Sequence, residues 1–209
     1  MPHPGLTLAQ SLEQVTHPVM IIGVDPGPVS SAYVAVRVRP DKAVVWCAYL
    51  PNKHCGSSIV PVFLRDMPPA PGEIRWLSYE RCGAQHCYVG SSVFETSEMA
   101  GAIREAFHGH VAGVYAMRPS EWRYALCGRG NARAPEIYAQ CCELFPLPTN
   151  KAADPYRGLK NDRGPFAPLY DAGAGGNVEH LKDALGAALA LTRVGFRTGG
   201  DPEMYRLAL

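Results

Sequence analysis

The sequence lacks three features, each of which would by itself assign a protein to a broad class. It has no excess of charge, because 20 Lys and Arg stand against 19 Asp and Glu in 209 residues, a formal net charge of +1. A simple polycation is therefore excluded, and any nucleic-acid binding must come from local clusters of charge. It also has no apolar run near the roughly 18 residues that a membrane span needs. Residues 1–18 have neither the basic nor the apolar region of a secretory signal, so we expect a cytoplasmic protein with no membrane partner.

The third missing feature is a cysteine framework. The seven cysteines are an odd number, and only Cys82, His86 and Cys87 begin a cluster, whereas a zinc signature needs two Cys/His pairs at short spacing. This pattern favours free thiols in a reducing cytosol.

The composition and the hydrophobic pattern predict one folded domain. Apolar residues make up 47% of the chain, which is ordinary for a globular protein. We expect an N-terminal extension over 1–18, a domain over 19–195 and a C-terminal tail over 196–209. Within the domain, short apolar runs predict strands and 3.6-residue periodicity predicts helices. The predicted strands are 19–24, 32–39, 43–50, 74–80 and 111–117, and the predicted helices are 92–107, one from 119, 135–145 and 177–192.

The order of these elements predicts an α/β fold with a mixed sheet and helices packed on it. The first run, 19–24, is continuously apolar, which is typical of a strand buried on both faces. Residues 51–72 contain several prolines and predict a loop without a regular element.

Acidic residues stand at the ends of two predicted strands. Asp25 ends the first, and Pro26-Gly27 turns the chain away at once, which puts the carboxylate where open α/β sheets bind ligands. Glu80 ends the fourth strand. The plain alternatives are an Asp that caps a turn and a surface Glu paired with Arg81.

The last helix adds a histidine and an aspartate on one face. His180 and Asp183 lie nearly opposite the apolar stripe, beside Ala184 and Ala187, whose small side chains let another element approach closely. The helix dipole favours a carboxylate and a neutral imidazole in these first turns. A metal ligand or a general base needs a neutral imidazole. A solvated helix face with an exposed His is the alternative.

If Asp25, Glu80 and Asp183 lie close together in the fold, their mutual repulsion requires bound cations. Three carboxylates from separate elements do not tolerate one another at one edge without positive charge. Hard oxygen ligands suit Mg²⁺, with Mn²⁺ as a substitute. Two such ions, roughly 4 Å apart, can activate a water and stabilise the leaving oxygen of a phosphodiester.

Several motifs occur in an order that resembles RuvC-type Holliday-junction resolvases of the RNase H-like superfamily. These motifs are Ile-Gly-Val-Asp-Pro-Gly at 22–27, Tyr-Glu-Arg at 79–81, Arg-Pro-Ser-Glu-Trp at 118–122 with Gly-Arg-Gly-Asn-Ala at 128–132, and His-Leu-Lys-Asp-Ala-Leu at 180–185. The match looks closer to compact phage or organellar relatives than to the standard bacterial enzyme. It implies an RNase H-like fold with a five-stranded mixed sheet flanked by helices.

The resemblance also implies a homodimeric, magnesium-dependent endonuclease that acts on branched DNA. It carries the metal-ligand role to Asp25, Glu80 and Asp183, with His180 as a further ligand or as the residue that positions the attacking water. There is one departure at a DNA contact, since Ala134 stands where the family usually has a Lys, and Arg133 is the candidate substitute. A second departure is that the helix between the third and fourth strands looks shortened into the proline-rich loop.

Basic residues gather on the segments expected to face DNA. Residues 118–133 have a local net charge of +3, and Arg81 and Lys182 flank the acids. A solvated surface charge is the alternative for each. Tyr88 and Phe94 follow the second acid, where an exposed aromatic can wedge between unstacked bases, although a core position suits Phe94 equally well. Gly101, between two alanines, suits either a dimer seam or packing on the chain's own sheet. The candidate DNA contacts are Arg81, Arg118, Arg123, Arg129, Arg133, Lys182 and Tyr88.

The leading hypothesis is a structure-selective DNA endonuclease that resolves four-way junctions by metal-dependent phosphodiester hydrolysis. One alternative is another RNase H-fold nuclease that acts on RNA–DNA hybrids or RNA. A second is a non-catalytic nucleic-acid-binding protein of the same fold. A third, a kinase-like ATPase, lacks a second phosphate loop in this sequence.

Overall fold

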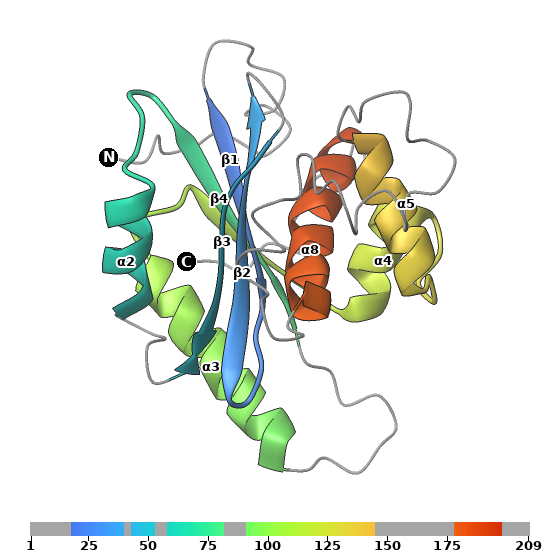
Figure 1. Ribbon diagram of the computed structural model, residues 1–209, viewed down its shortest axis with the longest axis horizontal. Coiled ribbons are helices and arrows are strands. Elements are labelled where there is room, and N and C mark those ends of the chain that lie inside the picture. Colours follow the sequence, from blue (N-terminus) through green and yellow to red (C-terminus); the bar gives the residue numbers. More distant parts are fainter. Residues whose placement is uncertain (1–17, 40–42, 53–57, 82–90, 145–177, 198–209) are drawn as a thin grey trace.

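A five-stranded mixed sheet forms the centre of the computed structural model, which describes residues 18–39, 43–52, 58–81, 91–144 and 178–197 (Figure 1). The strands are β1 (Val19–Asp25), β2 (Ser30–Arg39), β3 (Ala43–Pro51), β4 (Ile74–Glu80) and β5 (Gly113–Met117). Their order in the sheet is β3-β2-β1-β4-β5. The first three form an antiparallel meander, and β4 and β5 run parallel to β1. The α/β class, the mixed sheet and the meander are therefore confirmed.

The central strand, β1, is buried on both faces, as its continuous apolar run predicts. Val19 and Ile21 point into one hydrophobic core, and Met20, Ile22 and Val24 point into the other. All five side chains are at most 2% exposed. This double burial fixes the register of β1, because a slip by one residue would exchange its two faces.

Helices cover both faces of the sheet (Figure 1). On one side lie α2 (Ile59–Asp66) and α3 (Ser91–Phe107), whose buried side chains belong to the core around Met20 and Ile22. On the other side α8 (Val178–Arg197) packs on β1, β2 and β4, and α4 (Pro119–Cys127) and α5 (Ala134–Leu144) pack against α8. Because α8 lies between the sheet and these two helices, residues 184–191 are all buried.

The prediction that residues 51–72 contain no regular element is wrong, because α2 lies within this range. Pro61 is the third residue of α2. Proline is tolerated there because the first N–H groups of a helix have no partner within the helix. Ile59, Val60 and Phe63 of α2 are buried, so packing on the sheet stabilises this short helix.

Two predicted element boundaries also differ clearly from the structure. The last helix continues to Arg197 and so extends past the predicted end at 192. Gly195 lies inside this helix and does not end it. Strand β5 begins at Gly113, because Val111 and Ala112 form a bend, although the Ala112 N–H still donates to the Arg75 carbonyl at 2.7 Å. None of the described helices is long and apolar enough to cross a membrane.

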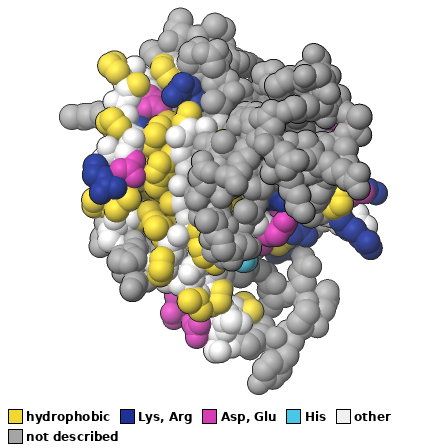
Figure 2. All heavy atoms as spheres, viewed as in Figure 1, with side chains coloured by type: hydrophobic (Ala, Val, Ile, Leu, Met, Phe, Trp, Pro, Cys, Tyr) yellow, Lys and Arg dark blue, Asp and Glu magenta, His cyan; other side chains and the backbone are white. Residues whose placement is uncertain are grey.

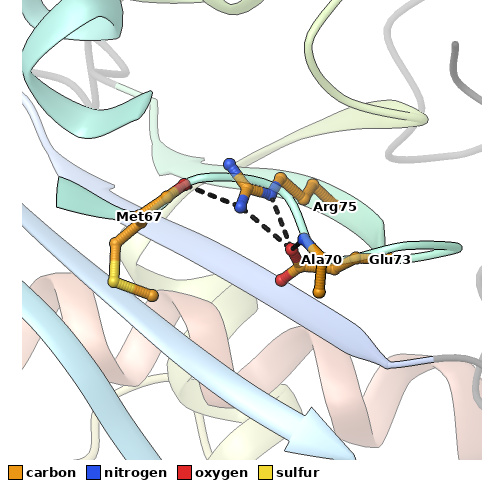
Figure 3. A network of polar contacts seen from close by, with 4 residues as sticks. All are labelled: Met67, Ala70, Glu73 and Arg75. Carbon is orange, nitrogen blue, oxygen red and sulfur yellow. Dashed lines mark hydrogen bonds and ion pairs between the residues drawn. The ribbon is translucent and has the colours of Figure 1, made fainter. Parts of the chain in front are cut away.

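A network of polar contacts around Arg75 links the end of α2 to the start of β4 (Figure 3). Arg75 Nη2 lies 2.9 Å from Glu73 Oε2, and both side chains are about 5% exposed or less. The same Glu73 oxygen accepts the Ala70 N–H, and Arg75 Nη2 donates to the Met67 carbonyl at 2.8 Å. The guanidinium also lies over the Phe63 ring, 5.1 Å from its centroid. These contacts anchor the amino end of β4 to α2.

The helix α8 and the sheet come into close contact at Gly23. A Cβ atom on Gly23 would lie 2.0 Å from the carbonyl oxygen of Ala184 and 2.8 Å from the Cβ of Ala188. Next to this contact, Ser78 Oγ donates to the Ala187 carbonyl at 2.9 Å. The predicted small-residue face of the last helix therefore does let another element approach, and that element is the sheet.

Substitution of Gly23 tests this packing. We expect Gly23→Ala to lower the free energy of unfolding by about 2–3 kcal/mol, because the clash is with a backbone atom that cannot rotate away. The matched control is Gly101→Ala in α3, where an added Cβ meets nothing within 4 Å. It should raise stability by about 0.5–1 kcal/mol, the helix-interior difference between Gly and Ala. Urea unfolding measures both, and equal stabilities for Gly23→Ala and wild type would contradict the packing.

Candidate functional site

Two acids lie side by side at the carboxyl edge of the sheet. Asp25 is the last residue of β1, and Glu80 is the last residue of β4. The strands are parallel neighbours, with Val24 opposite Tyr79. Their carboxyl ends therefore meet at one edge, as the strand pattern predicts.

His180 of α8 reaches Asp25. Its Nδ1 lies 2.8 Å from Asp25 Oδ2, and its ring stacks on Tyr49 of β3 with centroids 5.8 Å apart and planes 27° apart. An ionised carboxylate only accepts hydrogen bonds, so Nδ1 donates, and in a neutral ring Nε2 then carries the lone pair. The His180 side chain is 57% exposed and the Asp25 side chain 14%. The imidazole is thus held on one side and open on the other.

Glu80 is held by an indole. Trp122 Nε1 of α4 donates to Glu80 Oε2 at 2.8 Å. Burial raises the pKa of Glu80 from its ordinary value of 4.5 to about 7. The Trp122 hydrogen bond and Arg123 oppose this rise, and the charges of Asp25 and Asp183 add to it.

Asp183 completes an acidic cluster with Asp25 and Glu80. It lies on α8, one turn after His180, and is half-buried. Burial and then the charge of Asp25 raise its pKa from 3.8 to about 6, against the influence of Arg123. Burial likewise raises the pKa of Asp25, although His180 and Arg123 lower it. The sheet edge therefore joins three carboxylates that resist ionising together.

Arg123 of α4 acts on all three acids, because its positive charge lowers the pKa of each of them. The guanidinium lies over the Trp122 ring, 5.1 Å from its centroid, and its buried Nε has no hydrogen-bond partner among the described residues. One guanidinium cannot neutralise three carboxylates, so the cluster keeps an excess of negative charge when all three are ionised.

The donor set of this edge fits a hard divalent cation. Its carboxylate oxygens are the ligand type that suits Mg²⁺ or Mn²⁺. Among the described residues, the set adds one imidazole and no sulfur. Added positive charge would also relieve the burial and repulsion that raise the pKa values of Glu80 and Asp183. Within the described ranges, however, no three His, Cys, Asp or Glu side chains form a ready-made metal-binding group.

Of the other predicted DNA contacts, five lie among the described residues. Arg118 caps α4 and lies 4.0 Å from Glu121, and Arg129 pairs with Glu136. The Lys182 ammonium lies 2.9 Å from Glu179, and its side chain is only 14% exposed. Arg81 and Arg133 are exposed. Figure 2 shows Lys and Arg side chains at the right edge of the molecule, the side on which α4 and α5 lie in Figure 1.

Some predictions are corrected and others fall outside the described residues. Phe94 is 62% exposed, so it does not occupy the core. Gly101 is exposed, whereas Ala100 packs on the chain's own sheet. Tyr88 and the candidate zinc residues Cys82, His86 and Cys87 lie outside the described ranges. Cys47 and Cys127 are free thiols.

The sequence alone did not reveal the two aromatic contacts of the site. Tyr49 and Cys47 lie on the same face of β3 and pack against the core beneath α8. The alternation of side chains along a strand is enough to predict that they share a face. The stacking of Tyr49 on His180 joins residues far apart in the chain. Trp122 belongs to the motif at 118–122, but no pattern in the neighbouring residues indicates its hydrogen bond to Glu80.

Comparison with known proteins establishes the fold. The chain is similar to RuvC of Thermus thermophilus, at 18% identity and a TM-score of 0.56 over 90% of this chain and 99% of that one. It is also similar to T. thermophilus RuvC in complex with a Holliday junction substrate, at 18% identity and a TM-score of 0.54 over 84% and 96% of the chains. The yeast mitochondrial Holliday junction resolvase Ydc2 gives 6% identity and a TM-score of 0.45 over 90% of this chain and 86% of that one.

No protein-family model matches the sequence, and no curated protein matches it significantly. The structural likeness, at these identities, shows a shared RNase H-like fold of the RuvC type.

The raised pKa values predict how stability depends on pH. The folded protein holds the Glu80 proton more tightly than the unfolded chain does, so this contribution is fully present below about pH 4.5 and is lost as the pH rises through about 7. At about 1.4 kcal/mol per pKa unit, the loss is on the order of 3 kcal/mol. In EDTA, urea unfolding between pH 5 and 8 should show a steeper fall for wild type than for Glu80→Gln. Parallel curves would contradict the raised pKa.

Proposed function

We propose that this protein is a structure-selective DNA endonuclease that resolves four-way junctions by metal-dependent hydrolysis of phosphodiester bonds. The observation that carries the proposal is the cluster of Asp25, Glu80 and Asp183. Three elements far apart in sequence bring these acids to one edge of a RuvC-type, RNase H-like sheet. Three acids at this edge repel one another and lower the stability of the protein. A catalytic cation site accounts for their presence, because a bound cation needs these carboxylates as ligands.

The metal belongs to the proposal. Asp25, Glu80 and Asp183 would hold Mg²⁺, or Mn²⁺ in its place, with two ions per site. The one free lone pair of His180, on Nε2, can serve either as a further ligand or to position the attacking water, and we assign it to the water. Bound by the three acids, the ions would supply positive charge that makes the attacking water more acidic and offsets negative charge on the phosphate.

The chain's own side chains position the reactants. Asp25 and Tyr49 fix the His180 ring, so that Nε2 is directed away from Asp25 and can take a proton from the attacking water. Arg123, beside the acids, can pair with the phosphate. The water oxygen adds to phosphorus as the bond to the 3′ oxygen breaks, and the leaving 3′ oxygen takes a proton from solvent, which leaves 5′-phosphate and 3′-hydroxyl ends.

The basic residues beyond the acids suit a DNA backbone. Arg118 and Arg129 pair with exposed or half-exposed glutamates, and such pairs contribute little to stability. A phosphate can therefore replace the glutamate at small cost. We assign DNA contacts to Arg81, Arg118, Arg129, Arg133 and Lys182, and because their contacts are to phosphate, binding should weaken as salt is added.

Branched DNA is the substrate that the comparisons support best. One similar solved structure is of T. thermophilus RuvC in complex with a Holliday junction substrate. A four-way junction has two equivalent strands to cut, so a twofold homodimer would place one site at each. We include this homodimer in the proposal.

Removing one acid at a time should separate binding from catalysis. Asp25→Asn, Glu80→Gln and Asp183→Asn should each lower the rate of junction nicking in Mg²⁺ at least about 100-fold, because each removes a charge needed to hold the cation. Junction binding in EDTA, measured by fluorescence anisotropy, should be equal to that of wild type or tighter, since repulsion of phosphate falls.

Glu105→Gln, which neutralises an exposed carboxylate of α3, is the matched control and should nick at the wild-type rate. Nicking by Asp25→Asn as fast as wild type would rule out the proposed site.

Choice of substrate tests the function against its alternatives. We expect paired, symmetric nicks in a mobile four-way junction with Mg²⁺ and no nicks with EDTA. A linear duplex and an RNA–DNA hybrid of the same sequence should be cut at least about 100-fold more slowly. Preferential cleavage of the hybrid would instead identify another RNase H-fold nuclease, and binding without turnover in any metal would identify a non-catalytic protein.

A further inference from the structure

Trp122 bridges two of the elements that build the site. Its side chain is fully buried, and its Nε1 donates to Glu80 Oε2 at 2.8 Å across 42 residues of sequence. Glu80 ends β4, and Trp122 lies in α4, which packs on the outer side of α8. The indole therefore extends from beyond α8 to the carboxyl edge of the sheet.

The same ring presses against α8 close to Asp183. A Cβ atom on Gly186 would lie 2.6 Å from Cζ3 of Trp122 and 3.0 Å from Cη2. Gly186 is three residues after Asp183, so the contact lies within one helical turn of that acid. Because Gly186 has no side chain, the ring can approach the backbone of α8. The ring in turn sets the distance between α8 and α4, the helix that carries Trp122.

A second buried indole shows that packing alone does not account for the hydrogen bond. Trp76 of β4 is 1% exposed and presses against Gly113 in the way that Trp122 presses against Gly186. Its Nε1 has no hydrogen-bond partner among the described residues. Burial in this core therefore does not by itself provide a partner for an indole N–H, whereas the N–H of Trp122 meets a carboxylate of the acidic cluster.

We propose that Trp122 is a positioning residue that presets Glu80 and Asp183 for cation binding. Its N–H fixes Glu80 Oε2, and its ring fixes the spacing between Glu80 and the turn of α8 that carries Asp183. The inference deepens the proposed function and rests on its metal-dependent site.

A neutral donor suits this task better than a cation. An indole N–H occupies one lone pair of Oε2 and leaves the charge of Glu80, and its other oxygen, available to a metal. A Lys or Arg in that place would compete with the metal by neutralising the carboxylate. Arg123, whose guanidinium lies over the face of the same ring, is supported by Trp122 without a direct bond to Glu80 in the structure.

Trp122→Phe tests the role because it keeps an aromatic ring and removes the donor. We expect its affinity for Mn²⁺, measured by calorimetry without DNA, to fall about 10-fold or more, the usual effect of losing a group that orients a metal ligand. The Mg²⁺ concentration for half-maximal nicking should rise by the same factor, and junction affinity in EDTA should not change. Trp76→Phe is the matched control, since it removes a buried indole N–H that has no partner, and should bind Mn²⁺ as wild type does.

A double variant separates positioning from general damage to the core. In a Glu80→Gln background, adding Trp122→Phe should lower Mn²⁺ affinity by less than twofold, because the residue that Trp122 positions is already altered. A further drop of the full size would mean that the substitution acts through the fold at large, and would overturn the inference.

A measurement on the unsubstituted protein covers the case in which Trp122→Phe does not fold. In a spectrum of ¹⁵N-labelled wild type, the indole N–H signal of Trp122 should shift as Mg²⁺ is added, while that of Trp76 stays in place. Glu80→Gln should abolish the shift.

The outcomes distinguish this inference from the function on which it rests. If wild type binds neither Mn²⁺ nor Mg²⁺, the proposed function fails, and the inference fails with it. If wild type binds the metal but Trp122→Phe binds it within twofold of wild type, or the Trp122 signal does not move, the inference alone is wrong.

Discussion

The contact between Gly23 of β1 and the backbone of α8 is the constraint on which the rest of the structure depends. Only a residue without a side chain lets the Ala184 carbonyl come so close to the middle of the sheet. That approach places the first turns of α8 over the carboxyl edge, where His180 meets Asp25. Because α4 and α5 pack on the far side of α8, the position of Trp122 and Arg123 follows from the same contact.

The electrostatics of the edge follow from this geometry. Burial is the largest cause of the raised pKa values of Asp25, Glu80 and Asp183, and their mutual repulsion adds to it for Glu80 and Asp183. The fold keeps these acids although they make the unliganded protein less stable at neutral pH. Ionisable groups whose pKa values are strongly shifted by burial and by neighbouring charge are more common at functional sites than elsewhere.

The sequence predicted the parts of this site that depend on local pattern. Strand ends identified Asp25 and Glu80, and helical spacing put His180 and Asp183 on one face, because each signal lies within a few residues. The helix α2 was missed because prolines mark loops more often than first turns of helices. The Trp122–Glu80 bond and the Tyr49–His180 stack join residues distant in sequence, and only the packed fold brings them together. The metal remains a prediction, since no described cluster forms its complete site.

The order of elements along the chain has a consequence for synthesis. The strand β1 occupies the centre of the sheet, yet α8, which covers one of its faces, is the last described element. A growing chain that has reached β5 carries two of the three acids, Asp25 and Glu80, and still exposes half of its core. The complete acidic cluster and the covered face of β1 therefore arise in the same step, when α8 packs on the sheet.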